Sequence, residues 1–216
     1  TWEETAQAYL KLARSLFEAG RLPFCAGGDH AVTVPIVSAL GVLGTPVHVV
    51  QLDAHPDLYP VYEGNRDSHA CTGARVLEMP HVASLTQMGI RTLNRIQEEE
   101  IKRHGARLHL FGAGDLTGTL PDLEGVPPDG LVYLSIDLDC FEPAFAPGVS
   151  HPVPGGLTPR QVIDFIHRLP GRLVGMDVVE LNPSRDVGER TAVLAGRLLH
   201  EGMGVAVRQN GQANGS

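Results

Sequence analysis

Six side chains able to bind metal ions come from three short segments of this sequence. The segments are Gly27-Gly28-Asp29-His30, Asp53-Ala54-His55-Pro56-Asp57 and Asp137-Leu138-Asp139, and the six candidates are His30, Asp53, His55, Asp57, Asp137 and Asp139. The four carboxylates carry a formal charge of about −4 at neutral pH, which two divalent cations would cancel. Oxygen ligands with two imidazoles and no thiolate favour Mn²⁺ over Zn²⁺. The residue types therefore predict a centre for two Mn²⁺ ions.

Each of these segments follows an apolar run that predicts a buried β-strand. The runs span residues 22–26, 47–50 and 131–136. In the second segment, Asp53, His55 and Asp57 alternate, so a continuing strand would direct all three side chains to one side. Pro56 removes a backbone donor and predicts that strand pairing stops there. Because ligands collect outside the carboxyl ends of parallel strands, we expect the three segments to meet in one cleft.

The rest of the sequence alternates predicted strands with predicted helices. Further strands are expected near residues 85–90, 108–111 and 173–181, and helices over 1–19, 32–40, 68–78, 94–104, 158–169 and 189–201. The first helix should pack on the core through a stripe of apolar residues that Tyr9, Ala13 and Phe17 widen; its central row is Ala8, Leu12, Leu16 and Ala19. The alternation predicts a single α/β domain over residues 1–216, with three αβα layers and a parallel sheet of about six strands. We expect residues 205–216 to form a mobile tail.

The composition argues against two classes of protein. The 216 residues carry a formal net charge of −8 and contain no basic cluster, which argues against nucleic-acid binding. No apolar run approaches the roughly 20 residues that span a bilayer, and the first residues lack a signal-peptide pattern. Cys25, Cys71 and Cys140 are odd in number and lack CxxC spacing, which predicts free thiols and a cytoplasmic location.

The three segments also carry a family resemblance. Gly-Gly-Asp-His, Asp-Ala-His-x-Asp and Ser-Ile-Asp-x-Asp, in this order, resemble the binuclear manganese ureohydrolases, the arginases, agmatinases and their relatives. The resemblance runs from about Leu22 to His200 and implies an arginase-like parallel sheet of eight strands, of which this chain would lack the first two. It implies hydrolysis of a guanidino substrate to urea and an amine, by attack of a hydroxide that bridges two Mn²⁺ ions. It also implies a homo-oligomer, a trimer or a hexamer.

The resemblance assigns roles to the six metal-ligand candidates. Asp53 and Asp137 would bridge both ions. His30 and Asp57 would complete one coordination sphere, and His55 and Asp139 would complete the other. Asp57 is also similar in position to the family aspartate that passes a proton to the leaving amine.

Two further residues gain catalytic roles from the resemblance. Glu180 lies in Asp-Val-Val-Glu-Leu-Asn-Pro, similar to the family segment whose glutamate binds the guanidinium, although it could instead be a surface charge or an arginine partner. His69 matches a histidine at the active-site mouth that shuttles protons, with a solvated loop histidine as the alternative. A nucleophile pair of Cys71 and His69 is also conceivable, but it leaves the six metal-ligand candidates unexplained.

The substrate is less sharply indicated than the reaction. The segment Tyr59–His69 and Val149-Ser150-His151-Pro152 resemble a plant-type arginase and bacterial agmatinase-like branch. We rank agmatine first and arginine second, followed by guanidinobutyrate and formiminoglutamate. Asn65 and Asn94 are candidates for binding the far end of the substrate. The rival hypotheses are a related metal-dependent deacetylase with one metal ion, and an inactive truncated subunit that only binds metal.

Overall fold

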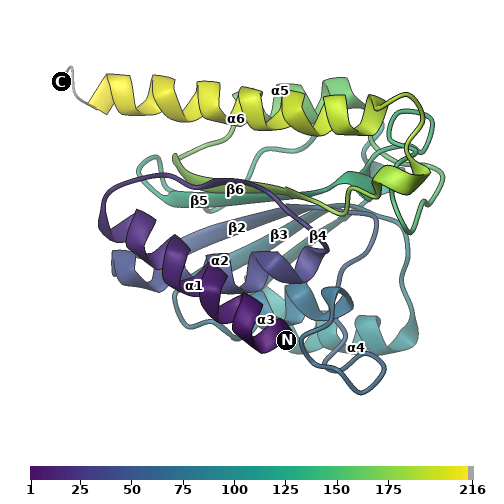
Figure 1. The fold of residues 1–216 in the computed structure, drawn as a ribbon, viewed down its shortest axis with the longest axis horizontal. Coiled ribbons are helices and arrows are strands. Elements are labelled where there is room, and N and C mark those ends of the chain that lie inside the picture. The colour runs from purple at the N-terminus through teal and green to yellow at the C-terminus, as the bar shows by residue number, and fades with distance from the viewer. Residues whose placement is uncertain (214–216) are drawn as a thin grey trace.

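A parallel six-stranded sheet forms the centre of the computed structural model, which describes residues 1–213 (Figure 1). Its strands lie in the order β1-β6-β5-β2-β3-β4. Their bounds are Phe24–Ala26 (β1), Val47–Leu52 (β2), Val82–Ile90 (β3), Leu108–Gly112 (β4), Leu131–Asp137 (β5) and Arg172–Val179 (β6). The central strands β2 and β5 are buried along nearly their whole length, as expected for a sheet covered on both faces. The predicted strand number is confirmed.

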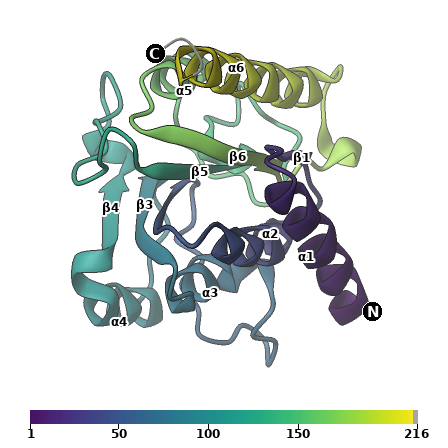
Figure 2. The ribbon, with the colours of Figure 1, turned by 90° about the vertical axis from the view of Figure 1, so that its left-hand side faces the viewer.

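Helices cover both faces of this sheet. The helices α5 and α6 lie on one face, and α1, α2, α3 and α4 lie on the other (Figures 1 and 2). Their bounds are Trp2–Glu18 (α1), Thr33–Ala39 (α2), Thr72–Glu78 (α3), Arg95–His104 (α4), Pro159–His167 (α5) and Arg190–Ala213 (α6). Two separate apolar clusters fill the spaces between the sheet and its two helical layers. The predicted three-layer α/β architecture is therefore confirmed.

The helix α1 packs through one side of its predicted apolar stripe. The buried side chains are Ala13 and Phe17, whereas Leu12 is 59% exposed. Tyr9 also packs against the cluster beneath, so the contact row is Tyr9-Ala13-Phe17. This row carries the aromatic rings, which bury more apolar area than the expected leucine stripe. The predicted stripe thus contained the buried row but was too wide, because Ala8 and Leu12 stay exposed.

The last helix extends beyond its predicted end, into the segment that was expected to be a mobile tail. The helix α6 continues from Arg190 to Ala213 rather than ending near residue 201. Val205 and Ala206 are buried in the core on this face. The side chain of Gln209 accepts a hydrogen bond from the backbone of Leu173 at 2.9 Å and donates one to Gly171 at 3.1 Å. These contacts hold the polar end of α6 against β6. Residues 214–216 lie outside the described part of the chain.

Two predicted helix starts are confirmed in detail. Thr158 caps α5, and its side chain and that of Gln161 form a reciprocal capping box. Asn94 caps α4, where its side-chain oxygen accepts a hydrogen bond from the backbone of Gln97. Across residues 1–213, no helix combines the length and apolar character needed to cross a membrane.

Candidate metal centre

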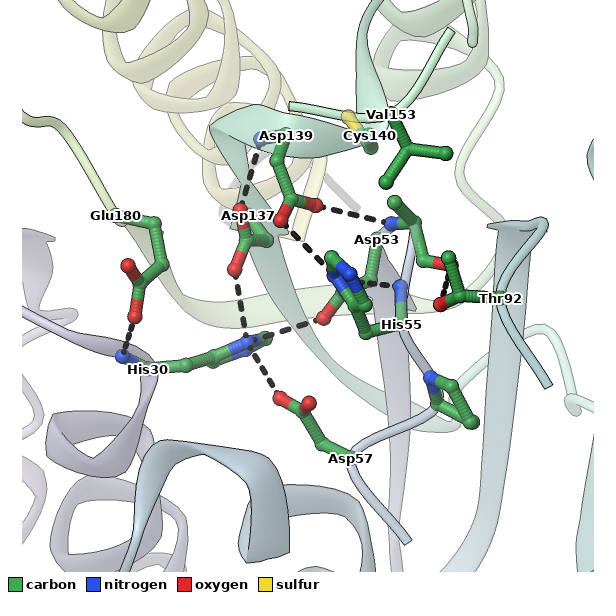
Figure 3. A network of polar contacts seen from close by, with 12 residues as sticks. His30, Asp53, His55, Asp57, Thr92, Asp137, Asp139, Cys140, Val153 and Glu180 are labelled. Atoms are coloured by element: carbon green, nitrogen blue, oxygen red, sulfur yellow. Dashed lines mark hydrogen bonds and ion pairs between the residues drawn. The ribbon is translucent and has the colours of Figure 1, made fainter. Parts of the chain in front are cut away.

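The three predicted segments meet outside the carboxyl ends of the strands (Figure 3). β2 and β5 are neighbours in the sheet, so Asp53 and Asp137 emerge side by side. β1 leads into a short 3-10 turn that begins at His30, two strands away from β5. The strand order changes direction between β2 and β5, and such a switch point opens a crevice for ligands.

The convergence of Asp53, His55 and Asp57 does not arise from strand alternation. β2 ends at Leu52, and the backbone of Asp57 has a left-handed φ of 50°. A left-handed aspartate is costly unless the surroundings hold it, and such residues concentrate at functional sites. An irregular turn, rather than a continuing strand, therefore brings the three side chains into one cleft.

One group of ligands surrounds His30, whose side chain is almost fully buried. Its Nδ1 atom lies 3.1 Å from Asp53 Oδ2, 3.1 Å from Asp57 Oδ2 and 3.3 Å from Asp137 Oδ2. The other carboxylate oxygen of Asp137 accepts a hydrogen bond from the backbone of Asp139 at 2.8 Å. This bond orients Asp137 so that its Oδ2 atom faces the imidazole.

A second group surrounds His55 and shares Asp53 with the first. The Nδ1 atom of His55 lies 3.0 Å from Asp139 Oδ2 and 3.6 Å from Asp53 Oδ1. Asp53 thus turns one carboxylate oxygen to each histidine. Ligand atoms of His30, Asp53 and Asp57 lie close enough to hold one ion, and those of Asp53, His55 and Asp139 to hold another. This shared carboxylate is the geometry expected of a ligand that bridges two metals.

The chemistry of these residues fits divalent cations. The buried Nδ1 atom of His30 makes no hydrogen bond within the described residues, although three carboxylates surround it. A buried polar atom without a partner is costly, and four clustered aspartates are costly without a counter-charge. Two divalent ions placed between the histidines and the aspartates would satisfy both requirements.

The close packing of these charged groups also shifts their pKa values. Burial disfavours protonation of His55, but the carboxylates of Asp139 and Asp53 outweigh it and raise its pKa to about 11. Burial and the charge of Asp53 raise the pKa of Asp57 to about 7. Burial and the charges of Asp139 and Asp53 raise the pKa of Asp137 well above its usual value. Without metal, the cluster therefore retains protons that a bound cation would have to displace.

A buried chain of hydrogen bonds lies behind His30, and no local sequence pattern predicts it. Ser135 Oγ lies 3.0 Å from His30 Nε2 and donates to Asp177 Oδ1 at 2.6 Å. Asp177 Oδ2 accepts from the hydroxyls of Tyr133 at 2.6 Å and Thr33 at 3.0 Å. Since the single proton of Ser135 goes to Asp177, Ser135 must accept from His30 Nε2–H. The chain therefore turns the Nδ1 atom of His30, rather than its Nε2 atom, toward the carboxylates.

Asp53 has its own buried support. Gln51 Nε2 donates to Asp53 Oδ2 at 2.7 Å, and Gln87 Nε2 donates to Gln51 Oε1 at 3.0 Å. Gln87 also donates to the carbonyl of Pro56 at 2.6 Å. Gln51 and Gln87 are paired across β2 and β3. Polar residues at buried positions of adjacent strands were a visible signal in the sequence, but their pairing required the register of the sheet.

Arg91 holds the loops around the second histidine. Its guanidinium donates to the carbonyls of Asp139 at 2.7 Å, Val153 at 2.6 Å and Phe141 at 3.2 Å, and also to two further carbonyls. All the donors of the guanidinium are thereby used, and the segment that carries Asp139 is tied to the end of β3. Arg91 is a structural clamp rather than a group free to bind a substrate.

A cavity of about 480 Å³ opens over the two ligand groups. Its floor includes His55, Asp57, Asp137 and Asp139, together with Glu180. Glu180 Oε1 accepts a hydrogen bond from the backbone of His30 at 2.8 Å, and its own φ is 66° (Figure 3). Burial raises the pKa of the Glu180 carboxyl. A second left-handed acidic residue is thus held at the cavity wall next to the histidine.

His69 is one of the residues that line the cavity. Its ring stacks on that of His151 with centroids 5.7 Å apart and an interplanar angle of 20°. His151 also meets the ring of His55 edge-on at 6.2 Å. His151 had no predicted role in the site. Cys71 donates to the carbonyl of Asn65 at 3.6 Å, so it points away from a role beside His69.

The two asparagine candidates differ in their position. Asn94 lies in the cavity wall, but its oxygen caps α4 and its amide nitrogen donates to Tyr59. Asn65 does not line the cavity, and its side-chain oxygen accepts a hydrogen bond from the backbone of Asp67 at 2.9 Å. The structure therefore brings only Asn94 to the cavity, with both ends of its amide already bonded.

Comparisons with known proteins agree with this geometry. A model of the arginase family matches residues 2–204. Mitochondrial arginase 1 of Arabidopsis thaliana is 45% identical over 83% of this chain and 53% of its own length, and agmatinase of Bacillus anthracis is 33% identical over 86% and 64%. The solved structure of arginase from Medicago truncatula superposes with a TM-score of 0.83 at 37% identity, over 94% of this chain and 65% of that one. The chain spans about half the length of the plant relative. With its sequence and its fold in agreement, this chain belongs to the arginase family.

Proposed function

We propose that this chain is a metal-dependent hydrolase that releases urea and an amine from a guanidino substrate. The observation that carries the proposal is the pair of ligand groups around His30 and His55 that share Asp53 beneath an open cavity. Mn²⁺ is the proposed metal, with two ions per chain, because oxygen ligands outnumber imidazoles in both groups. When bound, such a pair of ions activates a water as a nucleophile and offsets the charge of the carboxylates.

The side chains around the cavity have distinct proposed roles. Asp53 and Asp137 would hold both ions, His30 and Asp57 would hold one of them, and His55 and Asp139 would hold the other. Glu180 binds the guanidinium, because one of its oxygens is held by the backbone of His30 and the carboxylate lines the cavity. Charge-assisted hydrogen bonds of this kind orient a planar cation. Asp57 carries a proton to the leaving amine, and His69 exchanges protons with solvent at the mouth.

The test is release of urea from agmatine, arginine and guanidinobutyrate, with metal content measured on the same samples. The protein loaded with Mn²⁺ should release urea, and Asp53→Asn should lose both metal and activity. Asp164→Asn is the matched control, because Asp164 is an exposed aspartate of α5 that pairs with Arg160. Two bound ions without urea release from any guanidino substrate would favour the inactive metal-binding subunit instead. Normal turnover of Asp53→Asn would place the active site elsewhere.

The assembly and the compartment are further proposals. We propose a homo-oligomer, a trimer or a hexamer, and a cytoplasmic location. Cys25, Cys71 and Cys140 are unpaired in the structure, which suits a reducing compartment. The plant relatives are named as mitochondrial proteins, so localisation of the tagged chain is the direct test. Sedimentation of the metal-loaded chain tests the oligomer.

A further inference from the structure

A second cavity, of about 360 Å³, is lined by residues of α1, α2 and α3. These helices lie next to one another on the same face of the sheet (Figure 2). We call this space the α1 cavity, and it shares no lining residue with the cavity over the metal centre. Its size is in the range of pockets that bind small organic molecules. Its apolar wall includes Trp2, Ala6, Leu10, Val34, Pro35 and Met79.

Arg75 is a buried cation in the wall of the α1 cavity. Only 9% of the residue is exposed. Its Nη1 atom donates to the carbonyls of Pro60 at 3.2 Å and Arg66 at 3.4 Å, and its Nη2 atom donates to Glu78 Oε1 at 2.7 Å. Its buried Nε–H has no partner within the described residues. Because a buried donor without a partner is costly, such a group in a native protein usually meets a ligand or a water.

The positive charge around Arg75 is only partly balanced. Arg66 and Arg75 both pair with Glu78, at 2.8 Å and 2.7 Å, so one carboxylate serves two guanidinium groups. Glu3 and Asp67 also line the α1 cavity, but both are exposed, so water and salt screen their charges. A negatively charged oxygen inside the cavity would satisfy the free donor and complete the charge balance.

Arg75 also connects the α1 cavity to the active-site cavity. The carbonyls of Pro60 and Arg66 that it binds belong to the segment between Asp57 and Ser68. Tyr59 and Tyr62 of this segment line the cavity over the metal centre. A ligand that fixes the guanidinium of Arg75 should therefore also stabilise this segment.

We propose that the α1 cavity is a regulatory site for a small monocarboxylate with an apolar chain. The carboxylate accepts a hydrogen bond from Nε of Arg75, and the apolar chain lies against Leu10, Val34 and Met79. Occupation of the site stabilises the segment that Arg75 holds beside the metal centre. This inference concerns a second site and does not depend on the proposed function.

Trp2 provides a direct readout of binding, because it is the single tryptophan of the sequence and lines the α1 cavity. Three probes share one branched apolar chain: isocaproate ends in a carboxylate, isocaproamide in a neutral amide and isohexylamine in an ammonium. In fluorescence titrations of the full chain loaded with Mn²⁺, isocaproate should bind about tenfold or more tightly than isohexylamine, with isocaproamide between them. Equal binding of the acid and the amine, or no binding of any probe, would overturn the site.

Two variants locate the bound probe. Arg75→Lys keeps the positive charge but lacks the Nε–H, so isocaproate should lose most of its advantage over isocaproamide. Ala6→Leu fills part of the cavity from α1 without removing a bond of Arg75, so the affinity for all three probes should fall about tenfold. Thermal unfolding checks that each variant is folded, and Ala6→Leu keeps the test decisive if Arg75→Lys is unstable.

The matched control is Ala8→Leu. Ala8 lies on the same helix but is exposed and does not line the α1 cavity. The affinity for isocaproate should therefore change by less than about threefold. Equal effects of the two leucines would overturn the site, since isocaproate would then bind elsewhere, for example at the metal centre.

Amide hydrogen exchange of residues 60–66 tests the regulatory role. Saturating isocaproate should slow exchange in this segment about threefold or more, because the segment opens less often when the guanidinium of Arg75 is fixed. Isohexylamine should have no such effect, and Arg75→Lys should abolish the effect of isocaproate. Unchanged exchange with isocaproate bound would overturn the regulatory role. Neither measurement uses urea release, so a failure of the proposed function would leave both results unaffected.

Discussion

The hydrogen-bond chain from His30 to Asp177 should control the affinity of one metal site from a distance. In Asp177→Asn, the oxygen should stay where Tyr133 and Thr33 donate to it, and the amide nitrogen should face Ser135. That nitrogen can only donate, so Ser135 would have to turn its proton toward His30 Nε2. The imidazole would then carry its proton on Nδ1, where the metal is expected.

The size of the effect follows from the buried contacts that are lost. Each buried donor or acceptor left without a partner costs about 1–3 kcal/mol. Ser135→Ala leaves His30 Nε2 and one oxygen of Asp177 without their 3.0 Å and 2.6 Å partners, so we expect about 2–6 kcal/mol of lost stability. Partners that orient a metal ligand typically change metal affinity by about 10–100-fold. We expect this loss at the His30 site for both variants, with a smaller loss at the His55 site.

The assay is a competitive Mn²⁺ titration that resolves the two sites, with nitrogen-15 shifts of the His30 ring to report its tautomer. Ser84→Ala is the matched control, because Ser84 Oγ lies 2.8 Å from His48 Nδ1 in a serine–histidine pair remote from the ligands. It should lose about 0.5–1.5 kcal/mol of stability and no metal affinity. Unchanged binding of both ions by Asp177→Asn, with His30 still protonated on Nε2, would refute the reasoning.

Three further predictions concern the same cavity. Arg91→Met should lower the metal affinity of the His55 site by about 10–100-fold, because the carbonyls of Asp139 and Val153 lose their hydrogen-bond donor. Arg91→Lys should not restore this affinity. An equal loss of affinity at both sites in the titration would contradict the prediction. Binding of Mn²⁺ should release protons and strengthen as pH rises toward 11, because His55 holds its proton up to a pKa of about 11. In the metal-free chain, the raised pKa of His55 contributes stability that is full below about pH 6.5 and is lost as pH rises toward 11. The melting temperature of the metal-free chain should therefore fall over this range. A melting temperature and a Mn²⁺ affinity that do not change with pH would refute the raised pKa of His55. His69→Ala should slow urea release by about 10²–10⁴-fold with metal content unchanged, as elemental analysis would show; lost metal would mean that His69 is a ligand.

The metal-ligand candidates and the overall architecture could be predicted from local patterns. Each ligand segment follows its own apolar strand, and parallel strands place their carboxyl ends at one edge of the sheet. His30, Asp57 and Asp139 could thus be placed together before any long-range contact was known. The helix starts predicted at residues 94 and 158 were equally local, and the structure confirms both.

The supporting residues could not be predicted, because their partners are remote in the sequence. Ser135 lies 105 positions from His30, and each residue alone is an ordinary polar side chain. The buried face of α1 depended on which of its apolar residues, such as Phe17, packed against the core. The length of α6 depended on the hydrogen bond between Gln209 and the backbone of β6. Local sequence specifies strand ends and helix caps through nearby backbone bonds, whereas burial and pairing of side chains depend on the free energy of contacts between distant elements.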